Sequence, residues 1–212
     1  MAESSTSRPA RAPWDRNEMP GRFSVEETAR RVGNYKWVEM RIFELLGGWV
    51  GSVPEPDLKL RLGTHCYHHA FHAELWHKRL PQLREMDPTR LTLPANPAIE
   101  AFMDALGDNE RASDTLTKLV GMYRVLLPHL IAAYTFHRNN TASITDAPTI
   151  RALDFALADD LEEWRDGEMM IQSLIHGPGD VDRALERQAE LEKMMLAAGG
   201  VTGAGSVSSF GP

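Results

Sequence analysis

The segment that decides the fold spans residues 57–80 and reads DLKLRLGTHCYHHAFHAELWHKRL. Apolar and histidine side chains recur in it every three or four residues, which predicts an α-helix with one face turned toward a core. That face holds Leu58, Leu62, His65, His69, His72 and Trp76, with His68 at its margin. Pro81 is expected to end the helix, because proline has no backbone N–H and its ring clashes with the preceding turn.

The histidines are concentrated in this segment, which holds five of the eight in the chain. His65, His69 and His72 are four and three residues apart, so they project from the same side of a helix. Imidazole is the commonest metal-binding side chain and suits zinc, iron, copper and nickel. We interpret the three as candidate metal ligands; hydrogen-bonded histidines of a core or an interface are the alternative. Glu74 and His77 also have metal-site spacing, but they are expected on the solvated face.

Helical patterns flank this segment on both sides. The first begins with Ser24-Val25-Glu26-Glu27, a capping box whose Ser and Glu side chains satisfy free backbone N–H groups. It is expected to end at about Leu46, before Gly47-Gly48. Further long helices are predicted from about Asn109 to Arg138 and from Pro148 to Ile175, with a short helix at 98–106 between them and the second. Pro128 is expected to kink the third long helix.

These patterns predict an all-α fold, a four-helix bundle over residues 24–175. The connection between its second and third helices, at 81–96, is rich in proline and long enough to let these two helices run parallel. An additional helix at 178–198 is expected to dock on the bundle or on a second copy of the chain. Residues 1–23 are predicted to form a disordered arm and residues 199–212 a flexible tail.

One carboxylate falls within the apolar face of the first helix. That face holds Tyr35, Val38, Ile42, Leu46 and Trp49, and Glu39 lies among them. A buried carboxylate is costly unless it is paired, hydrogen-bonded or bound to a cation. If the first two helices turn back on each other near Ser52, Glu39 lies level with about His65 to His69. It is therefore a candidate metal ligand; pairing with an arginine, a hydrogen bond to a buried histidine or tyrosine, and a place at the edge of the face are the alternatives.

The third and fourth long helices add fewer candidates. The apolar face of the third includes Tyr123 and Tyr134, which we interpret as core residues, and carries no carboxylate. The predicted apolar face of the fourth holds Ile150, Leu153, Leu157, Leu161, Trp164, Glu168 and Ile171. The acidic run of Asp159, Asp160, Glu162 and Glu163 is interpreted as a solvated face, although Asp160 or Glu163 could complete a metal site.

In the order of its helices, in the long middle connection and in the segment from Leu153 to Glu168, the chain resembles the ferritin-like superfamily over about residues 24–175. The resemblance implies two metal ions held by a Glu on the first helix, Glu-x-x-His on the second, a Glu on the third and Glu-x-x-His on the fourth.

The residues that correspond to this pattern are altered in part. Glu39 stands at the position of the first helix, and His69-Ala70-Phe71-His72 stands at that of the second. The fourth helix has Asp160-Leu161-Glu162-Glu163, and the third has no carboxylate near Tyr123. Because only Glu39 and His72 keep the usual residue types, the resemblance implies a modified metal site.

The composition excludes several classes of function. The net charge is −7 and the pI is about 5.6, so no basic surface for a phosphate backbone is expected, and no nucleic-acid partner. The one cysteine, Cys66, cannot form an intramolecular disulfide. Residues 1–13 do not read as a secretory signal, and no apolar run approaches the roughly 20 residues that span a bilayer. A cytoplasmic protein without a membrane partner is therefore expected.

The leading hypothesis from the sequence is a non-haem, metal-dependent oxidoreductase that acts on a small molecule. Its cofactor would be iron or another divalent transition metal. The ligands would be Glu39, His65, His69 and His72, completed by Asp160 or Glu163. Metal–ligand bonds of about 2.0–2.2 Å imply that the unbound ligand atoms lie roughly 3–4 Å from one another.

Two alternatives stay open at this point. The first is a non-catalytic helical partner-binding or scaffold protein whose histidines line an interface. The second is a metal-independent small-molecule enzyme or binder that uses Glu39 and a histidine as an acid–base pair. A homo-oligomer is compatible with all three hypotheses.

Overall fold

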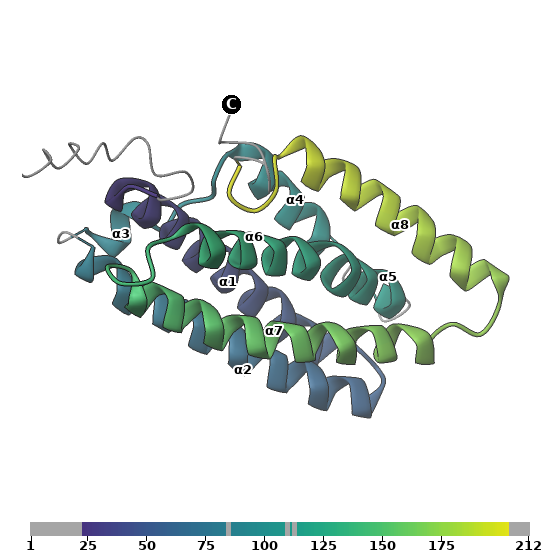
Figure 1. Cartoon of the computed structure of the whole chain (residues 1–212). Coiled ribbons are helices and arrows are strands. Elements are labelled where there is room, and N and C mark those ends of the chain that lie inside the picture. Colours follow the sequence, from purple (N-terminus) through teal and green to yellow (C-terminus); the bar gives the residue numbers. More distant parts are fainter. Residues whose placement is uncertain (1–22, 84–85, 109–110, 112–113, 204–212) are drawn as a thin grey trace, which may run out of the picture.

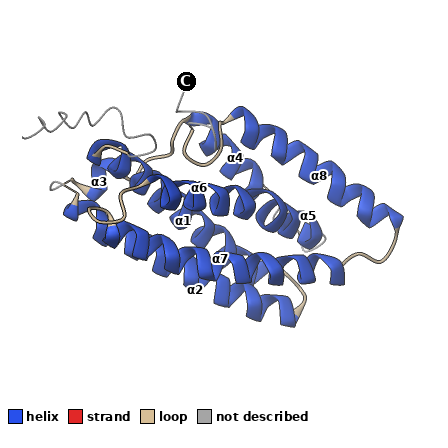
Figure 2. Cartoon of the chain, viewed as in Figure 1, coloured by secondary structure: helices blue, strands red, loops and turns tan. Residues whose placement is uncertain are grey.

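The computed structural model describes residues 23–83, 86–108, 111 and 114–203, and the regular structure within these ranges is entirely helical (Figure 2). The predicted all-α class is confirmed. The elements are α1 (Val25–Ser52), α2 (Pro56–Arg79), the 3₁₀ turn η2 (Leu80–Gln82), α3 (Pro88–Leu91), α4 (Pro97–Gly107), α5 (Thr115–Leu119), the π-helical η4 (Val120–Leu126), α6 (Leu127–Asn140), α7 (Ala147–Ser173) and α8 (Pro178–Ala197).

Four long helical segments, α1, α2, α5–η4–α6 and α7, pack side by side around a shared core (Figure 1). His65 of α2 contacts Tyr123 of η4, and Trp76 of α2 contacts Tyr134 of α6. Both members of the second pair lie 11 residues further along the chain than those of the first. The third segment therefore runs parallel to α2, as the sequence predicts from the long connection that carries α3 and α4. Helices α1 and α7 run opposite to both.

The first helix begins as predicted and ends later than predicted. The Ser24 hydroxyl accepts a hydrogen bond from the backbone N–H of Glu27, so the expected cap is present. The helix then continues through Gly47 and Gly48 to Ser52. Glycine disfavours a helix by only about 1 kcal/mol relative to alanine, and the buried side chains on either side of the pair hold the segment in helical form.

The third helix carries an irregularity next to Pro128. The backbone N–H of Leu127 bonds to the carbonyl of Met122, five residues back, at the end of a seven-residue π-helical segment. Pro128 cannot donate a backbone hydrogen bond, and a wider turn before it accommodates the missing donor. The helix begins at Thr115, six residues after the predicted start; part of that start lies outside the described residues.

The same helix contradicts the expectation that no apolar run approaches the length that spans a bilayer. The stretch Thr115–Asn140 is long and apolar enough to cross a membrane, with a mean hydropathy of 1.3 in its most apolar window. Of that window, 61% is buried inside the fold. Its apolar character is therefore that of a core helix packed against its neighbours.

The predicted inward face of α7 is right for Leu153 and Ile171, which are buried, and wrong for other members. Leu161 and Trp164 are 36% and 43% exposed. The face that packs against the core consists instead of Ala152, Leu153, Ala156, Asp160, Glu163, Gly167, Met170 and Ile171. The periodicity of large apolar side chains does not mark the inward face of α7, because that face is made mostly of small residues and two carboxylates.

The end regions are packed more than expected. Helix α8 docks on α4 and η4 through Ala184, Leu191 and Met195. Beyond it, Val201 and Thr202 are buried, and Arg30 donates a hydrogen bond to the Thr202 carbonyl.

The flexible tail predicted at 199–212 is therefore wrong for Val201 and Thr202, and residues 204–212 lie outside the described residues. At the other end, the Phe23 ring lies under the guanidinium of Arg31, 4.3 Å from it. The disordered arm predicted at 1–23 is wrong for its last residue, and residues 1–22 are outside the described ranges.

Gly167 allows a close approach of α7 to η4, and this generates a stability prediction. A Cβ added at Gly167 would overlap the Cβ and ring of Tyr123, near the backbone, where the ring cannot move aside. We expect Gly167→Ala to lower the free energy of unfolding by about 1–3 kcal/mol, the usual cost of overpacking.

The matched control is Gly48→Ala on α1, where an added Cβ meets nothing within 4 Å. It should be neutral or stabilise by about 1 kcal/mol. Thermal melts of both variants measure the difference; equal melting temperatures would contradict the close packing of Gly167 on Tyr123.

Candidate metal centre

Four buried side chains from three helices converge inside the fold. Glu39 of α1, His69 and His72 of α2, and Asp160 of α7 each place one potential ligand atom within 4.8 Å of the others. All four are completely buried. Helical spacing explains the local arrangement, because residues three apart on α2 project from one side and the antiparallel packing of α1 sets Glu39 level with His69.

Two of the distances between these ligand atoms fit the spacing expected for ligands of one ion. His69 Nδ1 lies 2.5 Å from Glu39 Oε2. His72 Nδ1 lies 3.4 Å from Glu39 Oε1 and 3.8 Å from Asp160 Oδ1. The last two values fall in the range of roughly 3–4 Å expected for ligands of one ion, while the 4.8 Å limit of the group is slightly wider.

Each of the two histidines donates from one nitrogen and leaves the other free. His69 Nδ1 bonds to Glu39, and His72 Nε2 bonds to Asp159 at 3.0 Å. His69 Nε2 and His72 Nδ1 are buried and have no hydrogen-bond partner. A histidine that binds a metal characteristically donates its other N–H to a carboxylate outside the ligand set. His72 has this arrangement, because Asp159 is not one of the four. His69 bonds instead to Glu39, which belongs to the four, and its Nε2 lies beside Glu163.

Asp160 is the least satisfied group of the cluster. Both of its carboxyl oxygens are buried without a hydrogen-bond partner. Burial, with the nearby Glu39 carboxylate adding to it, raises the pKa of Asp160 well above its ordinary value. An unpaired buried carboxylate is unfavourable, and a divalent cation between these ligands would stabilise its ionised form.

The other groups form compensating pairs. Burial by itself would raise the pKa of Glu39, but His69 and His72 outweigh it, and the pKa falls to about 2. Burial opposes the charged form of His72, but Glu39 and Asp159 raise its pKa to about 10. For His69, Glu163 and Glu39 likewise outweigh burial and raise the pKa well above the usual value. Without an ion, protons on the imidazoles balance the carboxylates; a metal would take their place.

The two remaining predicted ligands lie beside this group of four. Glu163 is buried and accepts a hydrogen bond from His68 at 2.8 Å, and its Oε2 lies 3.0 Å from His69 Nε2 without hydrogen-bond geometry. His65 Nδ1 is hydrogen bonded to the Tyr123 hydroxyl at 2.7 Å and lies 3.9 Å from Glu163 Oε2. The structure thus brings Glu39, His69, His72 and Asp160 together. Glu163 lies next to this group, beside His69, and His65 lies further out, beside Glu163.

The interpretation of the acidic run as a solvated face is wrong for two of its members, Asp160 and Glu163, which are buried. Asp159, a third member, bonds to His72. Asp166, which was not among the predicted site residues, lies 3.8 Å from His65 Nε2. The sequence contains a pattern that could have identified these acidic residues. The acidic positions 159–160, 163 and 166 recur every three or four residues, as the histidines on α2 do, so each set lies on one side of its helix.

Two tyrosines of the third helix act on the cluster through their hydroxyl groups. Tyr134 donates to Glu39 Oε1 at 2.5 Å and accepts from the Trp76 indole N–H at 3.1 Å. Tyr123, in the π-helical segment, contacts His65. Both are buried core residues, as predicted, and both also orient polar groups; π-helical turns are frequently found at functional sites.

Comparison with known proteins assigns no relative to this chain. No family model matches it, and neither a curated protein nor a solved structure does. The arrangement of donors is therefore the basis for interpreting the site: two imidazole nitrogens and two carboxylates can hold one divalent transition-metal ion.

The Tyr134 hydroxyl generates a prediction about metal affinity. Removing it in Tyr134→Phe frees Glu39 Oε1, and the loss of such an outer hydrogen bond typically weakens metal binding by about 10- to 100-fold. Zinc titration against a competing chelator measures the effect. Tyr67→Phe on α2 is the control, because Tyr67 is 68% exposed. Equal affinities for the two variants would mean that Tyr134 does not position the carboxylate.

Proposed function

We propose that this protein binds one divalent transition-metal ion, held by Glu39, His69, His72 and Asp160, and acts as a non-haem metal-dependent oxidoreductase. The observation that carries the proposal is the convergence of four buried side chains from three helices, several of whose polar atoms have no hydrogen bond. His69 Nε2, His72 Nδ1 and both oxygens of Asp160 lack hydrogen bonds within the described part of the chain. A cation satisfies all of them together.

Iron is the metal that we propose. Imidazole ligands suit iron, zinc, copper and nickel, whereas a set of two imidazoles and two carboxylates is less suited to copper(I) or to a thiolate-bound metal. The directions of the four long helices are those implied by the resemblance to the ferritin-like superfamily, whose members bind iron or manganese with carboxylates and histidines. We propose that the chain is a divergent protein of this kind.

The residues of the chain would have three tasks in such a site. Glu39 and Asp160 neutralise the charge of the ion, and the carboxylates that bond to His69 and His72 fix the imidazole rings. Tyr134, Trp76 and Tyr35 pack their rings within 5.6 Å of one another and exclude water from the side of the cluster toward the α2 C-terminus. A bound iron would supply electrons for the reduction of O₂ or a peroxide.

The alternatives fit less well. A scaffold function in which the histidines line an interface is disfavoured, because His65, His69 and His72 are buried within the chain. An acid–base mechanism could use the close Glu39–His69 pair, but both residues are completely buried, and neither lines the open pocket beside His65.

Metal content and oxygen chemistry test the proposal. Protein from cells grown with added iron and zinc, and purified without chelators, should contain about one ion per chain. His69→Ala should lose the ion and stay helical. His77→Ala should keep it, because His77 is exposed on the same helix and bonds to Lys36.

The protein loaded anaerobically with Fe(II) should then consume O₂ on exposure to air, and the Zn(II)-loaded protein should not, because zinc has no redox chemistry. Wild-type protein without stoichiometric metal would overturn the proposal altogether and favour the partner-binding alternative. Stable Fe(II) in air would leave the metal site intact but overturn the oxidoreductase activity.

A further inference from the structure

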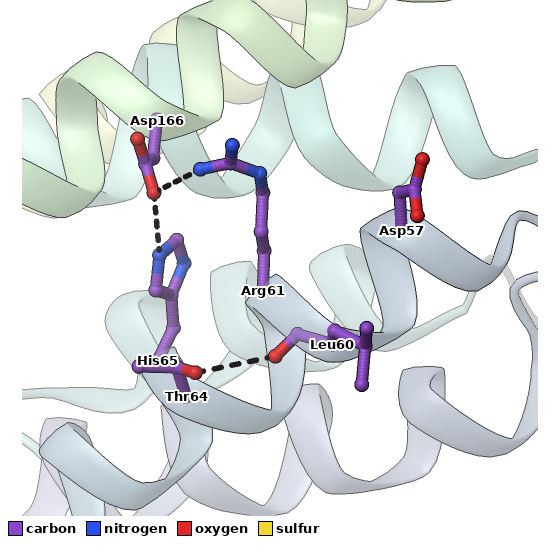
Figure 3. A pocket seen from close by; sticks show the side chains of 6 residues that line it. All are labelled: Asp57, Leu60, Arg61, Thr64, His65 and Asp166. Carbon is purple, nitrogen blue, oxygen red and sulfur yellow. Dashed lines mark hydrogen bonds and ion pairs between the residues drawn. The ribbon is translucent and has the colours of Figure 1, made fainter.

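An open pocket of about 440 Å³ lies between the first half of α2 and α7, next to the metal cluster (Figure 3). It is lined by Asp57, Leu60, Arg61, Thr64, His65 and Asp166. Asp166 bonds to the guanidinium of Arg61 at 2.6 Å and faces His65 Nε2 at 3.8 Å, as the dashed lines in the figure show. Two carboxylates and an imidazole thus surround a cavity in which Arg61 is the one cationic side chain.

His65 forms the inner wall of this pocket. Its side chain is 4% exposed, and its two nitrogens face opposite ways: Nε2 toward Asp166 and Nδ1 toward Tyr123 and Glu163. The ring therefore lies between the pocket and the buried cluster.

Beyond His65, ligand atoms follow one another into the interior. Glu163 Oε2 lies 3.9 Å from His65 Nδ1 and 3.0 Å from His69 Nε2. Both Glu163 Oε2 and His69 Nε2 are buried and without a hydrogen-bond partner. These two buried atoms are an observation independent of the acidic mouth, and they lead directly to His69, a member of the group of four.

We propose that this pocket is the entrance through which a hydrated divalent metal cation reaches the centre, exchanging ligands from Asp166 to His65, Glu163 and His69. This inference rests on the proposed metal centre. Asp57 and Asp166 attract the cation at the mouth. Arg61 is 47% exposed and is free to swing outward when the cation replaces it on Asp166.

The packing favours an ion over an organic substrate as the occupant. His65 lines the pocket and bonds to the buried Tyr123 behind it, whereas Glu39 is not among the lining residues, so an organic molecule held there does not contact Glu39. A metal ion needs no continuous channel, because it can pass along donor atoms 3–4 Å apart by changing one ligand at a time.

The rate of metal uptake tests this route. Cobalt(II) chloride is mixed with the full-length, metal-free protein in a stopped-flow instrument, and the visible absorption of the bound ion is followed. The double variant Asp57→Asn/Asp166→Asn should take up cobalt about 10-fold or more slowly than wild type, because charge at a cleft raises association rates by 10- to 1,000-fold. After equilibration, it should hold as many ions per chain as wild type.

Two further variants complete the design. Thr64→Trp fills the pocket without changing its charge and should also slow uptake, and Glu162→Gln removes an exposed carboxylate of α7 outside the pocket and should not. Uptake as fast as wild type in both pocket variants overturns the route. Loss of bound cobalt at equilibrium in the double variant also overturns it, since Asp166 would then be a ligand of the centre. Absence of cobalt binding by wild type would instead contradict the metal centre itself.

Discussion

The burial of carboxylates among imidazoles is the constraint on which the rest of the structure depends. Glu39, Asp160 and Glu163 are removed from water at the place where α1, α2 and α7 meet. Each ionised carboxylate there needs a positive partner, and the partners are His68, His69 and His72 of α2. This pairing fixes the register of the three helices, because a shift of one turn would leave a buried charge unpaired, at a cost that usually exceeds several kcal/mol.

Close packing around the cluster follows from two local features of the chain. Gly167 lets α7 approach the ring of Tyr123, and the π-helical segment before Pro128 carries that tyrosine to His65. On the opposite side, Tyr134 connects the cluster to the indole of Trp76. The polar centre is thus enclosed by hydroxyl groups that bond to it and by aromatic rings that exclude water. These contacts hold the side chains of the cluster in place.

The sequence predicts the parts of this arrangement that depend on local spacing. Helical periodicity identifies the face of His69 and His72 and the depth of Glu39, and the length of the middle connection predicts two parallel helices. The burial of Asp160 could not be predicted from α7 alone, because a carboxylate becomes an interior residue only through partners on other helices. Exposed apolar residues such as Trp164 had the opposite effect and suggested a core face where none exists.

Anomalous X-ray diffraction from crystals grown with iron or zinc tests the central claim most directly. The account predicts one strong anomalous peak inside the helices, about 2.0–2.2 Å from nitrogens of His69 and His72 and from oxygens of Glu39 and Asp160. The side chains should need only small movements to reach it, since their ligand atoms already lie within 4.8 Å of one another. An interior without a peak, with metal bound only at surface carboxylates, would contradict the account.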